Sequence, residues 1–282
     1  MITVLEVIKK TAEFLASKGV ESSRLNAEVL VGHALGLTRM KLYLQFERVL
    51  TEQELEIIRP LVRRRSQREP LQYILGYVEF SGLKLTVDKR ALIPRPETEY
   101  LIELVKETFA SNPPAKILDM GTGTGAIAIA LAKHFADSFV TALDLNEDTL
   151  SLALENIKAT GFIDRVNLIK SAWFTDVSRD TRFELIISNP PYLTESEVEK
   201  AALEVNKYEP RNALIAVDAG LSDIKTILSQ AKDYLMPGGI VVLETGETQH
   251  EQIHAFAASL NYKGFKSLKD LAGKDRYTFI TV

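Results

Sequence analysis

Cysteine is absent from the 282-residue sequence, which excludes disulfides, thiolate catalysis and cysteine-ligated zinc or iron–sulfur centres. No apolar run approaches the roughly 18 residues that a membrane-spanning helix needs, and the stretch from Ala126 to Ala132 is far shorter. Charged residues interrupt the first helix-like segment, so the uninterrupted apolar core of a secretion signal is also missing. We therefore expect a cytoplasmic protein.

Neither sign of charge is in large excess, because 34 Lys and Arg face 38 Asp and Glu, for a net charge of -4. A protein that mainly binds a bare phosphate backbone is usually basic, so a nucleic-acid role would need a local patch. Histidine is also scarce. The four histidines form no convincing metal-binding pattern, and the expected metal content is none; they are His33, His134, His250 and His254.

Residues 1–75 predict a small helical bundle. Apolar side chains recur at helical spacing within residues 4–15 and again within residues 25–34. Thr51 followed by Glu54 forms a capping-box pattern that opens a third helix. This part of the chain is also the more basic one.

Two further segments follow. Residues 76–95 contain two short β-like runs that predict a β-hairpin linker. Residues 96–282 alternate strand-like and helical stretches, which is typical of an α/β fold with a doubly wound, mostly parallel sheet. A terminal antiparallel hairpin brings the sheet to seven Rossmann-like strands, predicted at 116–120, 139–144, 167–171, 183–188, 239–244, 265–268 and 277–282.

A glycine-rich turn follows the first strand of this sheet and opens a helix near Ala126. Glycine allows backbone angles closed to other residues and lets a ligand approach the main chain. The N–H groups at the helix start then suit a carboxylate or phosphate. A tight strand-to-helix turn without a ligand is the alternative. The candidate cofactor-binding residues here are Asp119, Gly121, Thr122, Gly123, Thr124 and Gly125.

Asp144 ends the second strand, where a carboxylate can accept both hydroxyl hydrogens of a ribose, and Leu145 follows it. A helix cap is the structural alternative, but Asn146 already serves as a good N-cap. This spacing does not separate a nicotinamide dinucleotide from S-adenosylmethionine, since both carry an adenosine ribose. The glycines run G-x-G-x-G rather than G-x-G-x-x-G, which disfavours the dinucleotide.

The sequence Asn189-Pro190-Pro191-Tyr192 follows a buried strand at the same sheet edge. The two prolines stiffen the loop and remove two N–H donors. The Asn189 amide oxygen, the Pro190 carbonyl and the Tyr192 ring together match a planar group bearing an NH2. Such a nitrogen is a poor nucleophile, and two acceptors gripping its hydrogens orient it for methyl transfer without a strong base.

These motifs together resemble the class I S-adenosylmethionine-dependent methyltransferases, and more narrowly the HemK/PrmC family of release-factor glutamine methyltransferases. The resemblance spans nearly the whole chain, and the pairing of Pro-Arg-Pro-Glu-Thr with Asn-Pro-Pro-Tyr makes it specific. It is carried by residues 70–76, 93–99, 119–125, 189–192, 208–214 and 218–221.

The resemblance implies N5-methylation of the glutamine in the Gly-Gly-Gln loop of peptide-chain release factors, with S-adenosyl-L-homocysteine as the by-product. It implies cofactor contacts by the glycine turn, Asp144 and Trp173, with Asn189 near the methyl group. It implies that Asn189, Pro190 and Tyr192 are catalytic and that they grip the substrate together with Pro191. We expect the partner to be the release factor, with no nucleic acid or membrane required, and the protein to be a monomer.

Two rival functions stay open. An N6-adenine or N4-cytosine nucleic-acid methyltransferase would use the same acceptor chemistry, but the net charge of -4 and the lack of an obvious target-recognition insert argue against it. A module that binds S-adenosylmethionine without catalysis would not need the stiff acceptor loop. Separately, the basic cluster at 63–65 with Arg68 is interpreted as a solvated helix face or, alternatively, a docking surface for the protein substrate.

Overall fold

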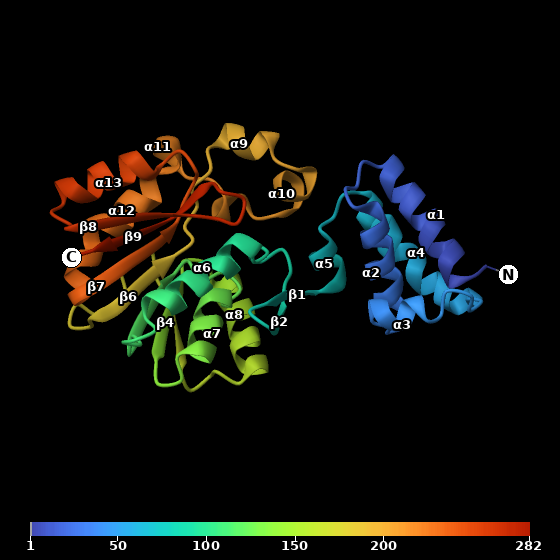
Figure 1. Ribbon diagram of the computed structural model, residues 1–282, viewed down its shortest axis with the longest axis horizontal. Coiled ribbons are helices and arrows are strands. Elements are labelled where there is room, and N and C mark those ends of the chain that lie inside the picture. The colour runs from blue at the N-terminus through green and yellow to red at the C-terminus, as the bar shows by residue number, and fades with distance from the viewer. Residues whose placement is uncertain (1) are drawn as a thin grey trace. The chain divides into compact units, whose positions relative to one another are not determined.

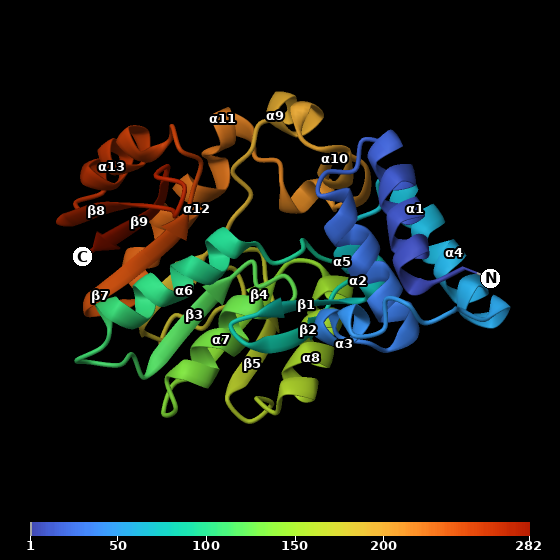
Figure 2. The ribbon, with the colours of Figure 1, turned by 45° about the vertical axis from the view of Figure 1, so that its right-hand side comes forward.

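The computed structural model describes residues 2–282, and the chain divides into two compact units (Figures 1 and 2). The first unit contains the residues up to Gly76 together with Ala202–Tyr208. The second contains Tyr77–Ala201 and Glu209–Val282. Two separate stretches of the chain therefore form the first unit, and the second stretch is the short segment Ala202–Tyr208.

The first unit is helical. Thr3 caps α1 and Thr51 caps α4, each through a complete capping box. Apolar side chains from α1, α2 and α4 form its core, with Ile8, Val31 and Ile58 almost fully buried. The helices are α1 (Val4–Ser17), α2 (Ser23–Leu35), α3 (Arg39–Tyr43), α4 (Glu52–Ser66), α5 (Leu71–Leu75) and α10 (Leu203–Tyr208).

The basic cluster at the end of α4 is largely neutralised within this unit. Arg65 is buried, and its Nη2 lies 2.8 Å from a carboxylate oxygen of Glu204 in α10. Arg68 binds both oxygens of the same carboxylate, at 2.7 Å each. Arg64 pairs with Glu69. The prediction of a solvated helix face is therefore wrong for Arg65, because the sequence did not indicate that α10 packs here.

The second unit contains a seven-stranded sheet with the order β5-β4-β3-β6-β7-β9-β8. The pairs between neighbours from β5 to β7 are parallel, and β9 is antiparallel to both β7 and β8. The predicted fold class is confirmed. The strands are β3 (Lys116–Met120), β4 (Phe139–Asp144), β5 (Val166–Lys170), β6 (Phe183–Ser188), β7 (Leu235–Glu244), β8 (Gly264–Lys269) and β9 (Asp275–Thr281).

Helices cover both faces of this sheet (Figure 2). One face packs against α6 (Pro96–Thr108), α7 (Ala126–His134) and α8 (Glu147–Thr160). The other packs against α12 (Ser222–Ala231) and α13 (His250–Ser259). The central strands are therefore buried on both sides, which explains why their sequences are mostly apolar.

The connections contain shorter elements. The predicted hairpin forms as β1 (Tyr77–Phe80) and β2 (Leu83–Thr86), and Phe80 and Leu85 bury their side chains in the core that also contains side chains of α6 and α7. The remaining helices are α9 (Glu195–Lys200) and α11 (Val217–Gly220), with 3-10 turns η1 (Arg211–Ala213) and η2 (Lys232–Tyr234).

Strand β7 begins at Leu235, earlier than the predicted Gly239. Pro237-Gly238-Gly239 indicates a turn in the sequence, but the chain stays beside β6 through a register shift opposite Phe183 and Leu185. Across residues 2–282 no helix combines the length and the apolar character needed to cross a bilayer.

Candidate functional site

The carboxyl ends of the parallel strands surround a cavity of about 490 Å³ in the second unit. Parallel strands place their carboxyl ends at one sheet edge, where open α/β sheets bind ligands. Most of the predicted site residues meet at this cavity. Those that line it are Gly121, Thr122, Gly123, Thr124, Asp144, Leu145, Trp173, Asn189 and Pro191.

The glycine turn contributes to the lining of the cavity and leads into α7. Gly121, Gly123 and Gly125 all have positive φ, at 71°, 57° and 81°. A Cβ on Gly123 would meet nothing within 4 Å, so this glycine is required by its backbone angle and leaves open space above the chain. Gly125 does not line the cavity, because it packs against Ile129 and Ala153.

Asp119 is fully buried below this turn rather than in the cavity lining. Its Oδ2 accepts hydrogen bonds from the Thr122 hydroxyl at 2.6 Å and from the Ala128 N–H at 3.2 Å. Its Oδ1 has no hydrogen-bond partner among residues 2–282. Burial raises the pKa of Asp119 to about 7, although both hydrogen bonds oppose the rise. Asp119 thus holds the turn and keeps one unsatisfied acceptor.

Asp144 is held by backbone N–H groups at the end of β4. Its Oδ1 accepts from Asn146 at 3.0 Å, and its Oδ2 accepts from Gly123 at 3.2 Å. Burial raises the pKa of Asp144, and these hydrogen bonds partly offset that rise. Each carboxylate oxygen has a further lone pair for a ligand. Leu145 beside it is 67% exposed, so it offers an apolar surface at the cavity rim.

Trp173 follows β5 with a left-handed backbone, at φ 52°. This conformation costs energy for a bulky residue and turns the chain sharply after the strand. The Ser171 hydroxyl donates to the Trp173 carbonyl at 2.7 Å. Burial raises the pKa of Asp223, and a hydrogen bond from the Trp173 side chain counteracts it. The indole is therefore fixed in the cavity lining, where a Cβ on Gly121 would lie 3.9 Å from its Cζ3 atom.

Asn189 is the tetrapeptide residue with its polar group at the cavity. Its Nδ2 donates to the Thr98 hydroxyl at 3.0 Å. Pro191 also lines the cavity, whereas Pro190 is buried and Tyr192 is partly buried, and neither belongs to the lining. The Tyr192 hydroxyl instead donates to Glu244 Oε1 at 3.2 Å.

Sequence reasoning missed Glu244, the last residue of β7. Its carboxylate is 1% exposed and accepts from the Thr98 hydroxyl at 2.7 Å as well as from Tyr192. Burial raises the pKa of Glu244 to about 7, against the effect of these two hydrogen bonds. The available signal was positional, because Glu244 ends a strand adjacent to the one that Asn189 follows.

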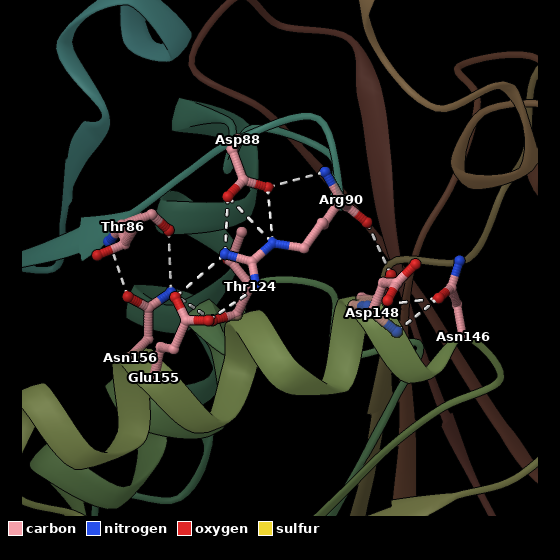
Figure 3. Close-up of polar contacts among 9 residues, drawn as sticks. Thr86, Asp88, Arg90, Thr124, Asn146, Asp148, Glu155 and Asn156 are labelled. Carbon is pink, nitrogen blue, oxygen red and sulfur yellow. Dashed lines mark hydrogen bonds and ion pairs between the residues drawn. The ribbon is translucent and has the colours of Figure 1, made fainter.

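The segment after β2 supplies a wall of the cavity that the sequence did not indicate, with Arg90, Leu92 and Arg95 in the lining. Asn156 in α8 ties this segment to the glycine turn, since its Nδ2 donates to the carbonyls of Thr86 and Thr124 (Figure 3). These segments are far apart in the sequence, so no local sequence pattern indicates that they are neighbours in the structure.

Ion pairs fix the same wall. Arg90 binds Asp88 and Glu155, each through 2.7 Å contacts (Figure 3). Arg95 binds Glu209 at 2.6 Å, and the other Glu209 oxygen accepts from the Ile93 N–H. Burial raises the pKa of Glu209, and Arg95 opposes the rise. Arg95 therefore stabilises the segment after β2 through its ion pair with Glu209 and also lines the cavity.

The residues that line the cavity fit S-adenosylmethionine. Asp144 has free lone pairs for ribose hydroxyls, Leu145 and Trp173 present apolar faces for a flat base, and the glycine turn leaves main-chain space. The donor set thus agrees with this cofactor.

The sequence is similar to known protein families and to individual proteins over nearly its whole length. Residues 6–76 match the PrmC N-terminal domain, and residues 111–280 match a methyltransferase domain. A release factor glutamine methyltransferase of Geobacter sulfurreducens is 40% identical over 97% of this chain and 95% of its own. One from Rhodopirellula baltica is 37% identical over 97% of this chain and 94% of its own. The chain belongs to the release factor glutamine methyltransferase family.

Membership in this family makes the protein an S-adenosylmethionine-dependent methyltransferase, in agreement with the donor set of the cavity. Among solved structures, a methyltransferase from Pyrococcus furiosus has a TM-score of 0.52 and 25% identity, over 71% of this chain and 88% of that one. The likeness supports the Rossmann-like fold of the second unit.

Proposed function

We propose that this methyltransferase transfers a methyl group from S-adenosylmethionine to the side-chain N5 of the glutamine in the Gly-Gly-Gln loop of peptide-chain release factors. The curated relatives, alike over nearly their full length, carry the name of that activity. The observation that carries the chemistry is Asn189, whose Nδ2 is occupied by Thr98 at the cavity wall, so that its Oδ1 is left to accept from a substrate.

Amide nitrogen is a poor nucleophile because its lone pair is delocalised into the carbonyl. We assign Asn189 Oδ1 and the Pro190 carbonyl as the acceptors that hold the two amide hydrogens, with Pro191 and Tyr192 confining the amide plane. Preorganised acceptors also stabilise the positive charge that develops on nitrogen as it is methylated. The proton can leave afterwards, when the nitrogen has become acidic.

S-adenosylmethionine, when bound, supplies an electrophilic methyl group on a sulfonium centre. We assign Asp144 to the ribose hydroxyls, with Leu145 and Trp173 flanking the base. Gly121, Thr122, Gly123, Thr124 and Gly125 would provide the main-chain bed, and Asp119 would anchor it from below through the Thr122 hydroxyl and the Ala128 N–H. Asn189 would lie at the junction of the cofactor and substrate positions.

We assign residues 1–75 to substrate docking, residues 76–95 to a linker and residues 96–282 to catalysis. A single glutamine is too small for a pocket alone to select, so additional contacts to the release factor are required. Because Arg65 and Arg68 are already paired with Glu204, exposed residues such as Arg63 are better suited to such contacts. The protein would act as a monomer in the cytoplasm, without nucleic acid.

Mass spectrometry of a purified release factor tests this proposal. After incubation with the protein and S-adenosylmethionine, we expect one methyl group on the glutamine of the Gly-Gly-Gln loop. A release factor variant with that glutamine replaced by glutamate is the control and should gain none. Methyl transfer to RNA or DNA that survives protease but not nuclease would instead favour the nucleic-acid alternative.

A further inference from the structure

Glu244 cannot contact the substrate directly. It is almost fully buried and does not line the cavity. It nevertheless lies beside the tetrapeptide, because Ser188 pairs with Leu243 and the next residues of the two strands are Asn189 and Glu244. Any effect of this carboxylate on the reaction must therefore pass through the side chains that it holds.

The hydrogen bonds around Glu244 have a defined direction. An ionised carboxylate only accepts, so the single hydroxyl hydrogen of Thr98 is directed to Glu244 Oε2, at 2.7 Å. The Thr98 oxygen then has only lone pairs for its other neighbour. Asn189 must present a donor to it, and its Nδ2 does so at 3.0 Å.

We propose that Glu244 is a positioning residue that, through Thr98, fixes the orientation of the Asn189 amide and so keeps the acceptor Oδ1 toward the substrate. The inference rests on the proposed function. A Thr98 hydroxyl released from Glu244 could donate to Asn189 Oδ1, which would turn Nδ2 toward the substrate. The NH2 group of Asn189 would then face the NH2 group of the substrate amide, which favours neither binding nor methylation.

Tyr192 shares the same carboxylate. Its hydroxyl donates to Glu244 Oε1, and the guanidinium of Arg276 lies 5.9 Å from its ring centre. Glu244 thus joins an amide acceptor and an aromatic wall of the tetrapeptide. Both of its oxygens are used as acceptors, so the ionised form is the one that satisfies every donor.

Four variants of the full-length protein test the role of Glu244. Glu244→Gln keeps the shape but replaces one of the two acceptor oxygens with an NH2 donor, and Thr98→Val removes the relay. We expect each to lower kcat for release factor roughly 10- to 100-fold, as loss of an oriented acceptor does. Thr98→Ser keeps a hydroxyl and should recover most of the loss. Glu184→Gln, at the opposite sheet edge, is the matched control and should retain wild-type kcat.

Cofactor affinity and coupling separate positioning from general damage. Calorimetric dissociation constants for S-adenosylmethionine should change less than about threefold in Glu244→Gln and Thr98→Val, because Asp144 and the glycine turn are untouched. The double variant should be no slower than Thr98→Val, since both changes break one relay. The proposal would be overturned if the kcat losses of Glu244→Gln and Thr98→Val multiplied in the double variant. It would also be overturned if the Thr98→Ser variant were as slow as Thr98→Val.

The pH profile provides a further readout. Protonation places a donor on the carboxyl, so kcat at saturating cofactor should fall as the pH drops below the Glu244 pKa, which burial raises to about 7. The charged and titratable groups facing it are Glu97 from α6, Arg276 and Tyr277 from β9, and Tyr192. Glu244→Gln should be slow and lack this step; an unchanged step would contradict the assignment.

Nuclear magnetic resonance of the protein without cofactor tests the amide directly. The side-chain NH2 signals of Asn189, identified by their loss in Asn189→Asp, should include one slowly exchanging proton that becomes fast in Thr98→Val and Glu244→Gln. Unchanged exchange would overturn the proposal even if activity fell. If the wild type protects this proton but methylates no release factor, the positioning role stands and the proposed function fails.

Discussion

Asn189 and Asp144 are polar residues in one cavity, but their surroundings give them different roles. Asn189 is oriented by a side-chain relay at the end of β6, whereas Asp144 is oriented by backbone N–H groups at the end of β4. A substitution at each should therefore affect a different step of the reaction.

Replacing Asn189 with alanine should mainly slow turnover. The variant loses the oriented Oδ1, and loss of one positioned group typically costs about 3 kcal/mol in the transition state, or roughly 100-fold in kcat. Calorimetry should show little change in affinity for S-adenosylmethionine. Steady-state methyl transfer to release factor measures the first effect. A variant with normal kcat would exclude Asn189 from the chemistry.

Replacing Asp144 with alanine should mainly weaken cofactor binding. Two charge-assisted hydrogen bonds to a ribose would be lost, and each is typically worth about 1.5–3 kcal/mol, so the dissociation constant should rise roughly 100-fold or more. Turnover at saturating cofactor should fall much less than in Asn189→Ala. Equal defects in kcat and affinity for both variants would contradict the separate roles.

The place of these two residues at the cavity could be predicted from the sequence, because Asp144 ends one recognisable strand and Asn189 follows another at the ligand edge. Glu244 also ends a strand, but its role depends on the rotamers of Thr98 and Tyr192, which no local pattern specifies. Asp119 shows the opposite case. Its sequence position indicates a cofactor contact, whereas the structure buries it beneath the turn, bonded to Thr122.

At the scale of elements, α11 supports the tetrapeptide loop. Asp218, Ala219 and Gly220 are consecutive left-handed residues, with φ values of 56°, 53° and 80°. Gln249 Nε2 donates to the carbonyls of Ala219 and Tyr192, at 3.1 and 3.0 Å. The strained turn and the loop are thus held together by one amide, which suggests that the turn positions the loop backbone.

Replacing Gly220 with alanine should displace this loop. The added Cβ would lie 2.1 Å from the Tyr192 carbonyl oxygen, which is backbone and cannot move away cheaply. Gly161→Ala is the matched control, because Gly161 has φ 80° and open space around its Cβ position. The control should cost about 1–2 kcal/mol of folding free energy for the left-handed conformation.

Gly220→Ala should cost roughly 1–3 kcal/mol more than this control, as overpacked sites do, and should also lower kcat. Urea unfolding measures the first difference and methyl transfer the second. Equal stability of the two variants would mean that the loop relaxes freely around Gly220.

The regular elements were largely predictable, since helical periodicity, capping boxes and buried strands are local patterns. The bed of the cavity followed from the glycine turn. The segment at 88–95 did not, because its place depends on Asn156 bonding Thr86 and Thr124 across long stretches of chain. Long-range hydrogen bonds of this kind leave no periodic signal.

At the scale of the whole molecule, the chain leaves the second unit after Ala201 and returns to it at Glu209, and α10 in between belongs to the first unit. The main polar tie of α10 is Glu204, which binds Arg65 and Arg68. Burial alone would raise the pKa of Glu204, but the hydrogen bonds from Arg68 and Arg65 outweigh it and lower the pKa to about 2.

Glu204→Gln should therefore destabilise the first unit by about 1–3 kcal/mol, because buried Arg65 loses its charged partner and keeps only neutral acceptors. Glu56→Gln on the exposed face of α4 is the matched control and should change stability by less than about 0.5 kcal/mol. Chemical unfolding followed by a probe in the first unit measures the difference.

The contribution of the Glu204 ion pairs to stability should depend on pH in a defined direction. Since the Glu204 pKa is about 2 when folded against 4.5 as its ordinary value, its contribution is fully present above pH 4.5 and is lost as the pH falls toward 2. Wild type and Glu204→Gln should therefore converge in stability across this window, whereas wild type and Glu56→Gln should run in parallel. A constant gap between wild type and Glu204→Gln down to pH 2 would show that packing, not the ion pair, holds α10 in place.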